Sequence, residues 1–337
     1  MQMRSSSIVL KYKQTKATNI VNKDLESFSW TDVANGEADR VSLRLNNRIK
    51  KWLKGYFPKE KDYFKIWLKV NHWRWNSDNR KKFCGKFQVD DFSASGFANT
   101  FNLEGISIPI HTGFNVTQRS KTYKKTSVKS ILKDIAKRAD VKLVYDAENH
   151  KIDEISQSGK TDMEFAFSVC EDYGLSMKVY NSKLVVYDQT KYEKRAISFT
   201  IDINDIGGSD AYSYKRNITS IYDGVKLQYQ NKDGDDITYK YVLPGKKGKR
   251  ILVISTSADN HADAERKAKA QLASNLRSAE TLTLKLMGDP KYLACQTFEL
   301  TGFGKINGKY FIDKVTHSIE GGYKTTIVAH PVVTQLG

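Results

Sequence analysis

The feature that most constrains the fold is a run of alternating residues near the C-terminus, at positions 281–287. Leu282, Leu284 and Leu286 fall on one side of an extended chain, while threonine and lysine side chains fall on the other. A period of two residues is typical of a β-strand with one buried face. Further strand-like segments and turns follow. Residues 281–330 therefore predict an antiparallel meander, which usually closes into a barrel or covers its edge strands.

Three groups of turn residues divide this region. Gly288-Asp289-Pro290 follows the first strand, and Glu320-Gly321-Gly322 precedes the last one. Asn307-Gly308 lies between residues 303–306 and 309–315. This pair predicts a hairpin with a type I′ turn, because both central residues of that turn need a positive φ.

The segment from Gly308 to Thr316 has a counterpart far upstream, from Gly85 to Ser93. Glycine, lysine and aspartate coincide, and aromatic, aliphatic and hydroxyl residues fall at similar places. Two explanations fit this pattern: chance similarity between two hairpin strands, or two copies of one β-domain at the two ends of the chain. A duplication changes the whole fold prediction, so both explanations stay open at this point.

Length and composition favour two or three globular domains. The chain has 337 residues, of which 39% are hydrophobic and 28% are charged. No apolar run approaches the length of a membrane span, so we expect no membrane insertion. Only three consecutive apolar residues lie near the start, too few for a signal peptide, and we expect the protein to be made and to fold in the cytoplasm.

The chain is strongly basic, with a formal net charge of +17. The basic residues are concentrated at positions 44–86 and 119–142. Nucleic-acid binding is one explanation of such charge. A basic face that docks an acidic protein or lines a channel is the other. The sequence carries no motif of a nucleic-acid-binding fold, so we prefer the protein partner.

All five tryptophans lie in the first 75 residues, as in an aromatic β-core. Residues 62–75 resemble one long strand, in which Trp73 and Trp75 are expected to share a face beside Arg74. Aromatic and basic residues in this order suit stacking on bases. They equally suit a subunit interface, where Trp and Arg are enriched. The candidate interface residues are Trp52, Trp73, Trp75, Arg74, Lys50 and Lys51.

The middle of the chain has a different pattern. Thr126 is expected to cap a helix with apolar residues at helical spacing. Thr161-Asp162-Met163-Glu164 has the form of a capping box, and Gly174 marks the end of that second helix. We expect an α+β protein, mainly β, with a first β-domain at residues 1–108, a small α/β domain at 109–190, and a second β-domain at 191–337 with an inserted helix near 260–276.

The sequence predicts no catalytic, cofactor-binding or metal-binding residues. The six histidines and three cysteines are scattered singly, without the spacing of a metal site. The motifs of zinc proteases, of serine hydrolases and of phosphate-binding loops are not present in the sequence. We therefore expect a protein that is not an enzyme.

Taken in order, these features resemble the late control protein D-like baseplate hubs of contractile phage tails and of tail-derived bacteriocins. The resemblance covers nearly the whole chain. It rests on Phe28, Trp30, Asp32, Gly36, Ala38, Asp39, Val41, Leu43 and Trp52, on the helix at 126–138, on Gln157, Ser158, Asp162, Phe165, Tyr173 and Gly174, and on the alanine-rich helix, Gly288-Asp289-Pro290, Gly302-Phe303-Gly304, Gly308-Lys309-Tyr310 and His317. One departure is Cys295-Gln296, where the family leads us to expect a glycine.

The resemblance implies two tube-like antiparallel β-barrels with the small α/β domain between them. It also implies a homotrimer that joins a six-fold tail tube to a three-fold central spike in the baseplate of a phage tail or tailocin particle. The implied partners are the tail tube protein, the central spike protein, other baseplate proteins and a tape-measure protein. A basic nucleic-acid-binding β protein remains the alternative.

Overall fold

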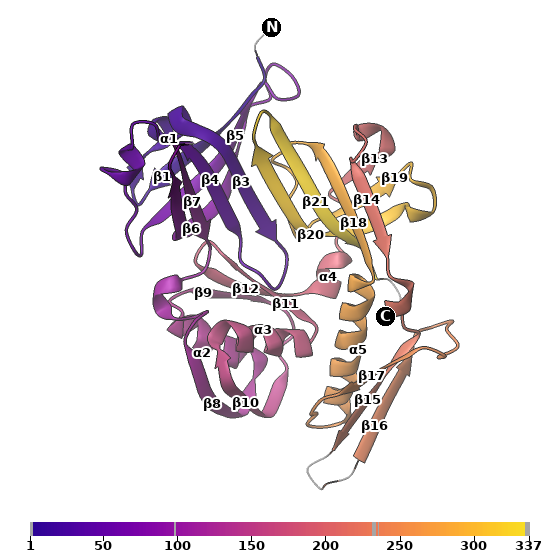
Figure 1. Cartoon of the computed structure of the whole chain (residues 1–337). Coiled ribbons are helices and arrows are strands. Elements are labelled where there is room, and N and C mark those ends of the chain that lie inside the picture. The colour runs from indigo at the N-terminus through magenta and orange to yellow at the C-terminus, as the bar shows by residue number, and fades with distance from the viewer. Residues whose placement is uncertain (1–2, 98, 231–233, 235, 334–337) are drawn as a thin grey trace.

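The computed structural model describes residues 3–97, 99–230, 234 and 236–333. The protein is α+β and mainly β, as predicted. Two β units lie side by side, a small α/β unit lies below the first of them, and helix α5 with a three-stranded sheet lies below the second (Figure 1). Among the described residues, no helix combines the length and the apolar character needed to cross a membrane.

The elements follow the chain in four groups. The first β unit contains β1 (Ser5–Tyr12), β2 (Thr15–Lys16), α1 (Thr18–Asp24), β3 (Leu25–Val33), β4 (Arg40–Asn46), the 3-10 helix η1 (Lys51–Leu53), β5 (Tyr63–Asn71), β6 (Arg80–Ser95) and β7 (Thr100–Ile106). The α/β unit contains η2 (Ile110–Thr112), β8 (Gln118–Ser127), α2 (Val128–Arg138), β9 (Lys142–Asp146), β10 (Lys151–Thr161), α3 (Asp162–Asp172), β11 (Leu175–Tyr180), β12 (Lys183–Asp188) and α4 (Gln189–Glu193).

The second half is interrupted by the α5 group. The second β unit contains β13 (Phe199–Asp202), η3 (Ile203–Asp205), β14 (Tyr212–Arg216), β18 (Glu280–Met287), β19 (Thr297–Thr301), η5 (Gly304–Ile306), β20 (Gly308–Ile319) and β21 (Tyr323–Pro331). Between β14 and β18 lie η4 (Ile218–Ser220), β15 (Gly224–Gln230), β16 (Asp236–Val242), β17 (Ile251–Ser255) and α5 (His261–Ser278).

One large sheet runs through both β units. Its strand order is β14-β18-β21-β20-β3-β4-β7-β6-β5-β1-β2, and β19, with β13 beside it, pairs with β20. The antiparallel pair β3–β20 joins the two units by backbone hydrogen bonds. The expected simple meander is wrong in one respect, because β18 pairs with β21 rather than with β19. The loop at 288–296 carries the chain past two strands before β19 begins.

The alternating patterns read from the sequence do form half-buried strands. In β18, Leu282 and Leu284 are fully buried and Leu286 is nearly so, with threonine and lysine side chains on the other face. In β4, Val41 and Leu43 are buried in the same way in the core of the first unit. The apolar side of each strand therefore fixes which face of the sheet meets the core.

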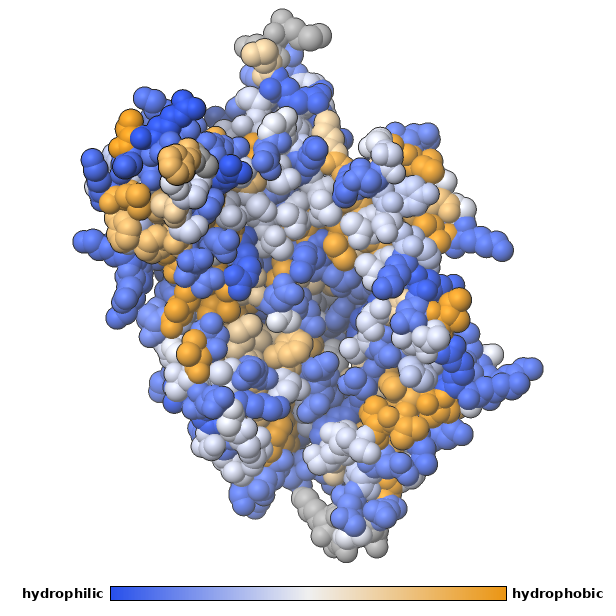
Figure 2. Space-filling model, viewed as in Figure 1, coloured by the Kyte–Doolittle hydropathy of each residue, from blue (hydrophilic) through white to orange (hydrophobic). Residues whose placement is uncertain are grey.

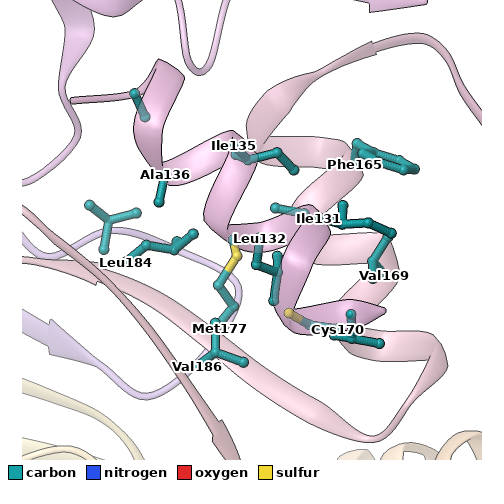
Figure 3. Close-up of a cluster of buried hydrophobic side chains, with 14 of the residues drawn as sticks. Ile131, Leu132, Ile135, Ala136, Phe165, Val169, Cys170, Met177, Leu184 and Val186 are labelled. Atoms are coloured by element: carbon teal, nitrogen blue, oxygen red, sulfur yellow. The ribbon is translucent and has the colours of Figure 1, made fainter. Parts of the chain in front are cut away.

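The α/β unit has its own core between two helices and a three-stranded sheet. Side chains from α2 and α3 meet those from β11 and β12 in this core (Figure 3). The capping box predicted for α3 is confirmed, because Thr161 and Glu164 each bond the backbone N–H of the other. The predicted cap of α2 is off by one residue. Ser127, the last residue of β8, and not Thr126, accepts the N–H of Ser130.

The alanine-rich helix forms as predicted, with Asn260 at its N-cap. Ala264, Ala268 and Leu272 make a buried stripe along α5. Their small size lets the helix lie close to the sheet β16-β15-β17, where Leu227 completes the core. The inserted helix therefore covers a separate small sheet.

The type I′ turn predicted at Asn307-Gly308 is wrong. Residues 304–306 form the 3-10 helix η5 rather than a strand, and Asn307 has a φ of −58°. The Asn307 side chain accepts the N–H of Phe303 at 2.7 Å and closes a longer loop. The hairpin joins β19 to β20, and its first residue pair is Leu300 with Gly308.

Candidate assembly interface

The joint between the two β units is a buried strand pair with an aromatic centre. Trp30 of β3 lies opposite His317 of β20, and the two rings stack at 4.9 Å. Burial lowers the pKa of His317 to about 4, so its imidazole is neutral at pH 7. Its Nε2 donates to the carbonyl of Tyr292 at 3.0 Å, and its Nδ1 accepts the hydroxyl of Tyr323 at 2.8 Å. The His317 ring is therefore buried with both of its nitrogens hydrogen-bonded at this joint.

A polar clamp extends this joint to the loop after β5. The Trp73 indole donates to the Gly288 carbonyl at 2.6 Å, and its ring packs against Tyr323. Asp289 is almost fully buried, and its carboxylate bonds Arg74 at 2.7 Å and Arg80 at 2.6 Å. Two of the candidate interface residues, Trp73 and Arg74, therefore lie at a contact between units of one chain.

The expectation that Trp73 and Trp75 share a strand face is wrong. Strand β5 ends at Asn71, and His72 has a φ of +49°, which breaks the alternation of an extended chain. Trp73 turns inward and is 5% exposed, while Trp75 is 62% exposed. The structure therefore gives these two tryptophans opposite environments.

The other candidate residues lie on one loop of the first unit. Trp52 is buried in the core, where its indole donates to Asp24 at 2.7 Å and its ring stacks near Phe101. Lys51 forms an ion pair with the same carboxylate at 2.7 Å. Lys50 is exposed and has a left-handed backbone. Lys50 and Trp75 are thus exposed candidates, as is Arg74, although Arg74 also pairs with Asp289.

A buried charge cluster fixes the α/β unit to the first β unit. The Lys178 ammonium of β11 lies 2.5 Å from Asp32 and 3.2 Å from Asp39. Burial alone lowers a lysine pKa, but these two carboxylates outweigh it and raise the pKa of Lys178, so the ammonium stays charged. The second Asp32 oxygen accepts the N–H of Ala294 from the second unit. One aspartate therefore contacts all three units.

A second cluster ties α4 and α5 to the second β unit. Glu193 bonds Arg277 at 2.6 Å and the His330 Nε2 at 3.3 Å, while the His330 Nδ1 lies 2.8 Å from Asp313. Burial lowers the pKa of His330, but the two carboxylates more than compensate and raise it to about 9. His330 is therefore an imidazolium at neutral pH.

The sequence could not reveal these partners. Asp289 was expected only as a turn residue, and nothing in the sequence pairs it with Arg80, more than 200 positions away.

Among the residues that the structure describes, no group of three or more His, Cys, Asp or Glu side chains is placed to hold a metal ion.

The sequence repeat corresponds to a repeat in backbone geometry. Gly85 and Gly308 have nearly the same φ, +147° and +142°. Five residues further on, Asp90 and Asp313 are each the extra residue of a β-bulge. An unusual glycine conformation and a bulge at the same spacing are shared features of the backbone geometry, which similar residue types alone do not produce. They favour duplication over chance.

The strands around each copy agree as well. The order β3-β4-β7-β6-β5 in the first unit matches β14-β18-β21-β20-β19 in the second. The pairing is antiparallel throughout both series. Each end of the chain therefore carries one copy of a five-stranded arrangement.

Comparison with known families agrees with this fold. A sequence model described as YQBQ-like matches residues 116–327. The chain belongs to the YQBQ-like family. No curated protein matches its sequence.

Solved structures similar to this YQBQ-like chain are phage tail and secretion proteins. The 43 kDa tail protein of prophage MuSo2 from Shewanella oneidensis has a TM-score of 0.73 at 11% identity, over 97% of this chain and 99% of that one. A tail protein from Neisseria meningitidis MC58 has a TM-score of 0.72 at 14% identity, over 97% and 96%. The c3393 protein of E. coli, a type VI secretion component similar to the phage T4 tail proteins gp27 and gp5, has a TM-score of 0.60 at 11% identity, over 96% and 77%.

The predicted resemblance to phage tail hubs is therefore confirmed in the fold. The sequence of this YQBQ-like chain departs from the expected pattern at Cys295-Gln296, and the backbone there has a distinct conformation. Cys295, where a glycine was expected, has a φ of +66°. The backbone keeps the left-handed conformation that glycine adopts without strain, although a thiol side chain now occupies the position.

Proposed function

We propose that the protein is a structural baseplate hub, in which three copies join a six-fold tail tube to a three-fold central spike. The observation that carries this proposal is the duplicated five-stranded unit. Three chains bring six similar units together, which matches a six-fold neighbour on one side, while the trimer itself keeps three-fold symmetry for the other. A role in assembly needs complementary surfaces rather than a catalytic site.

The proposed partners are the tail tube protein, the central spike protein, other baseplate proteins and a tape-measure protein. In this proposal residues 1–108 and 191–337 supply the ring, and residues 109–190 lie outside it. The outward-facing candidates Lys50 and Trp75 then contact neighbouring chains. The particle is a phage tail or a tailocin, put together in the bacterial cytoplasm.

The nucleic-acid-binding alternative loses one of its two supports in this geometry. Besides the basic charge it depended on Trp73 and Trp75 stacking from one strand face, and Trp73 is buried against Gly288 and Tyr323. The net charge of +17 is then assigned to contacts with acidic protein surfaces.

Light scattering on a sizing column, at low and high salt and with the 260/280 nm absorbance ratio, tests the proposal. We expect three times the chain mass of 38.4 kDa and no bound nucleic acid. The chain co-expressed with the tube and spike proteins of its own particle is then expected to bind both. A chain that stays monomeric both alone and with these partners would contradict the hub, and nucleic acid released by salt would favour the alternative.

A further inference from the structure

Two strand edges are left open at opposite sides of the molecule. In β20, residues 314–319 pair with β3 on one edge and with β21 on the other. Within the part of the chain that the structure describes, the matching residues 91–95 of β6 pair with β7 alone. Among the same residues, strand β14 pairs only with β18, although its counterpart β3 has two neighbours. Each open edge presents unpaired backbone N–H and C=O groups.

Solvent exposure confirms that both edges lack a neighbour that their counterparts have. Trp30 and Phe28 of β3 are 1% exposed, whereas Tyr212 of β14 is 50% exposed. Val315 and His317 of β20 are buried, whereas four of the five residues at 91–95 of β6 are exposed. On the face shown in Figure 2, apolar side chains lie in several separate groups among hydrophilic ones. Strand edges are thus a clearer guide to a partner than apolar patches.

The duplication indicates that the open edge of β14 pairs with the open edge of β6. Within one chain, β3, the first strand of the five-stranded series in the first unit, pairs with the bulged strand β20 of the second unit. We propose that β14, the first strand of the five-stranded series in the second unit, pairs antiparallel with residues 91–95 of the bulged strand β6 of the first unit in a second copy of the chain. This inference rests on the proposed hub. The contact is head-to-tail, so repeating it three times closes a ring.

The register of the proposed β14–β6 pair follows from the β3–β20 pair within one chain. Trp30 in β3 pairs with Val41 of β4, and Tyr214 in β14 pairs with Leu282 of β18. Val41 and Leu282 occupy the same position in their units, so Trp30 and Tyr214 are equivalent. Trp30 lies opposite His317, and the counterpart of His317 in the repeat is Ala94. Tyr214 therefore lies opposite Ala94 of the second copy.

One and two positions further along β14, Lys215 lies opposite Ser93 and Arg216 lies opposite Phe92 of the second copy. The charges of the two strands are complementary near this point. Lys215 is diagonal to Asp91, a separation that a long side chain spans. The Lys215 ammonium thus meets the Asp91 carboxylate, while Asp90 and Arg216 are paired within the chain, with Arg40 and Glu280.

Exposed aromatic rings also match across this joint. Phe57 lies edge-on to Phe92 at 5.0 Å and is 48% exposed. In the second unit the corresponding loop covers the joint, since the Tyr292 carbonyl there binds His317. Pairing with β14 brings Tyr212 and Tyr214 over the small Ala94 and next to Phe57. The loop that carries the candidate Lys50 then lies at the subunit contact.

Cysteine pairs in the full-length chain test the register. Residues directly opposite in an antiparallel pair have Cβ atoms about 4.5–5.5 Å apart, close to the spacing of a disulfide. We expect the K215C/S93C chain to give covalent species of two and three chains on a non-reducing gel, and reductant to dissolve them. The matched control K215C/S95C places the thiols on a diagonal of about 7–8 Å and is expected to cross-link roughly tenfold less. Native Cys84 and Cys170 are buried, and the wild-type chain is the background control.

The outcomes separate the two proposals. A trimer by light scattering in which K215C/S93C does not cross-link, or cross-links no better than K215C/S95C, overturns the strand pairing and leaves the hub. A chain that stays monomeric alone and with its tail partners overturns both.

Charge reversal gives a second test that keeps the backbone intact. Lys215→Glu or Asp91→Lys alone is expected to weaken association by about 2–5-fold in Kd, because each places like charges across the joint. The double variant is expected to restore the wild-type Kd. Lys240→Glu, on an exposed part of β16 in another sheet, is the matched control. No effect of the single variants, or the same effect from Lys240→Glu, counts against the joint.

Discussion

The two β units have the same strand order but meet different neighbours. Asp32 and Asp39 of the first unit are both acidic and buried, and the second unit has Arg216 and Glu280 at the corresponding positions. Arg216 and Glu280 neutralise one another in a half-exposed ion pair at 3.2 Å. The aspartates instead need Lys178 from the α/β unit. The first copy of the duplicated fold thus depends on a charge from the α/β unit. In the second copy the charges at the same positions neutralise one another beside the open edge of β14.

Removing the charge of Lys178 is expected to have the largest effect on stability. Lys178→Met leaves two buried carboxylates without their cation, which costs roughly 3–5 kcal/mol of unfolding free energy. Arg216→Met, at the exposed pair of the second unit, is expected to cost less than about 1 kcal/mol. Chemical denaturation of both variants measures the contrast. Equal losses would mean that the two units do not differ in this way.

The clamp between the units comes next. Trp73→Ala removes a buried ring and leaves the Gly288 carbonyl without its donor, at a cost of about 3 kcal/mol. Trp75→Ala, two residues away and exposed, is expected to stay within about 0.5 kcal/mol of wild type. Thermal unfolding of the pair decides this. A large loss for Trp75→Ala and none for Trp73→Ala would reverse the assignment.

The buried His330 of the second unit predicts an alkaline pH dependence, and the first unit has Ile106 at the matching position. The folded pKa of His330, about 9, lies above its unfolded value. Its contribution is therefore complete below about pH 6.5 and is lost as the pH rises through 9, amounting to about 3 kcal/mol. Unfolding free energies from pH 6 to 9.5 measure this loss.

The variant His330→Gln is expected to lack that alkaline slope. His317 acts in the opposite direction, because its folded pKa of about 4 removes stability as the pH falls below about 6.5. The acid slope should therefore persist in His330→Gln. An unchanged alkaline slope in this variant would assign it to other groups.

The smallest expected effect concerns the loop of the second unit at Cys295. Cys295→Gly relieves a left-handed backbone, but it loses side-chain contact with Tyr187 and adds freedom to the unfolded chain. These terms offset one another to within about 1 kcal/mol. Cys295→Ala keeps the strain and loses the contact, so it should be the less stable of the two variants. Denaturation midpoints compare them.

Sequence patterns predicted the parts of the fold that depend on neighbouring residues. Alternation located β4 and β18, and the pair Thr161 and Glu164 located the start of α3, because burial period and capping are local. The repeat at Gly85 and Gly308 was also visible, since it needs an unusual backbone at a fixed spacing.

Long-range contacts could not be predicted in this way. The positive φ of His72 separates Trp73 from Trp75, and a side-chain bond from Asn307 replaces the expected turn. The contacts of Lys178 and Asp289 join residues that are far apart in the chain, and no local pattern encodes such a pair. The structure accordingly divides the interface candidates between the interior and the surface.

Electron cryomicroscopy of the purified full-length assembly tests the central claim most directly. The account predicts three chains in a closed ring, with six similar β units about 60° apart and one continuous sheet crossing every joint. A dimer, an open chain, or a trimer whose β units do not alternate as first and second around the ring would contradict it.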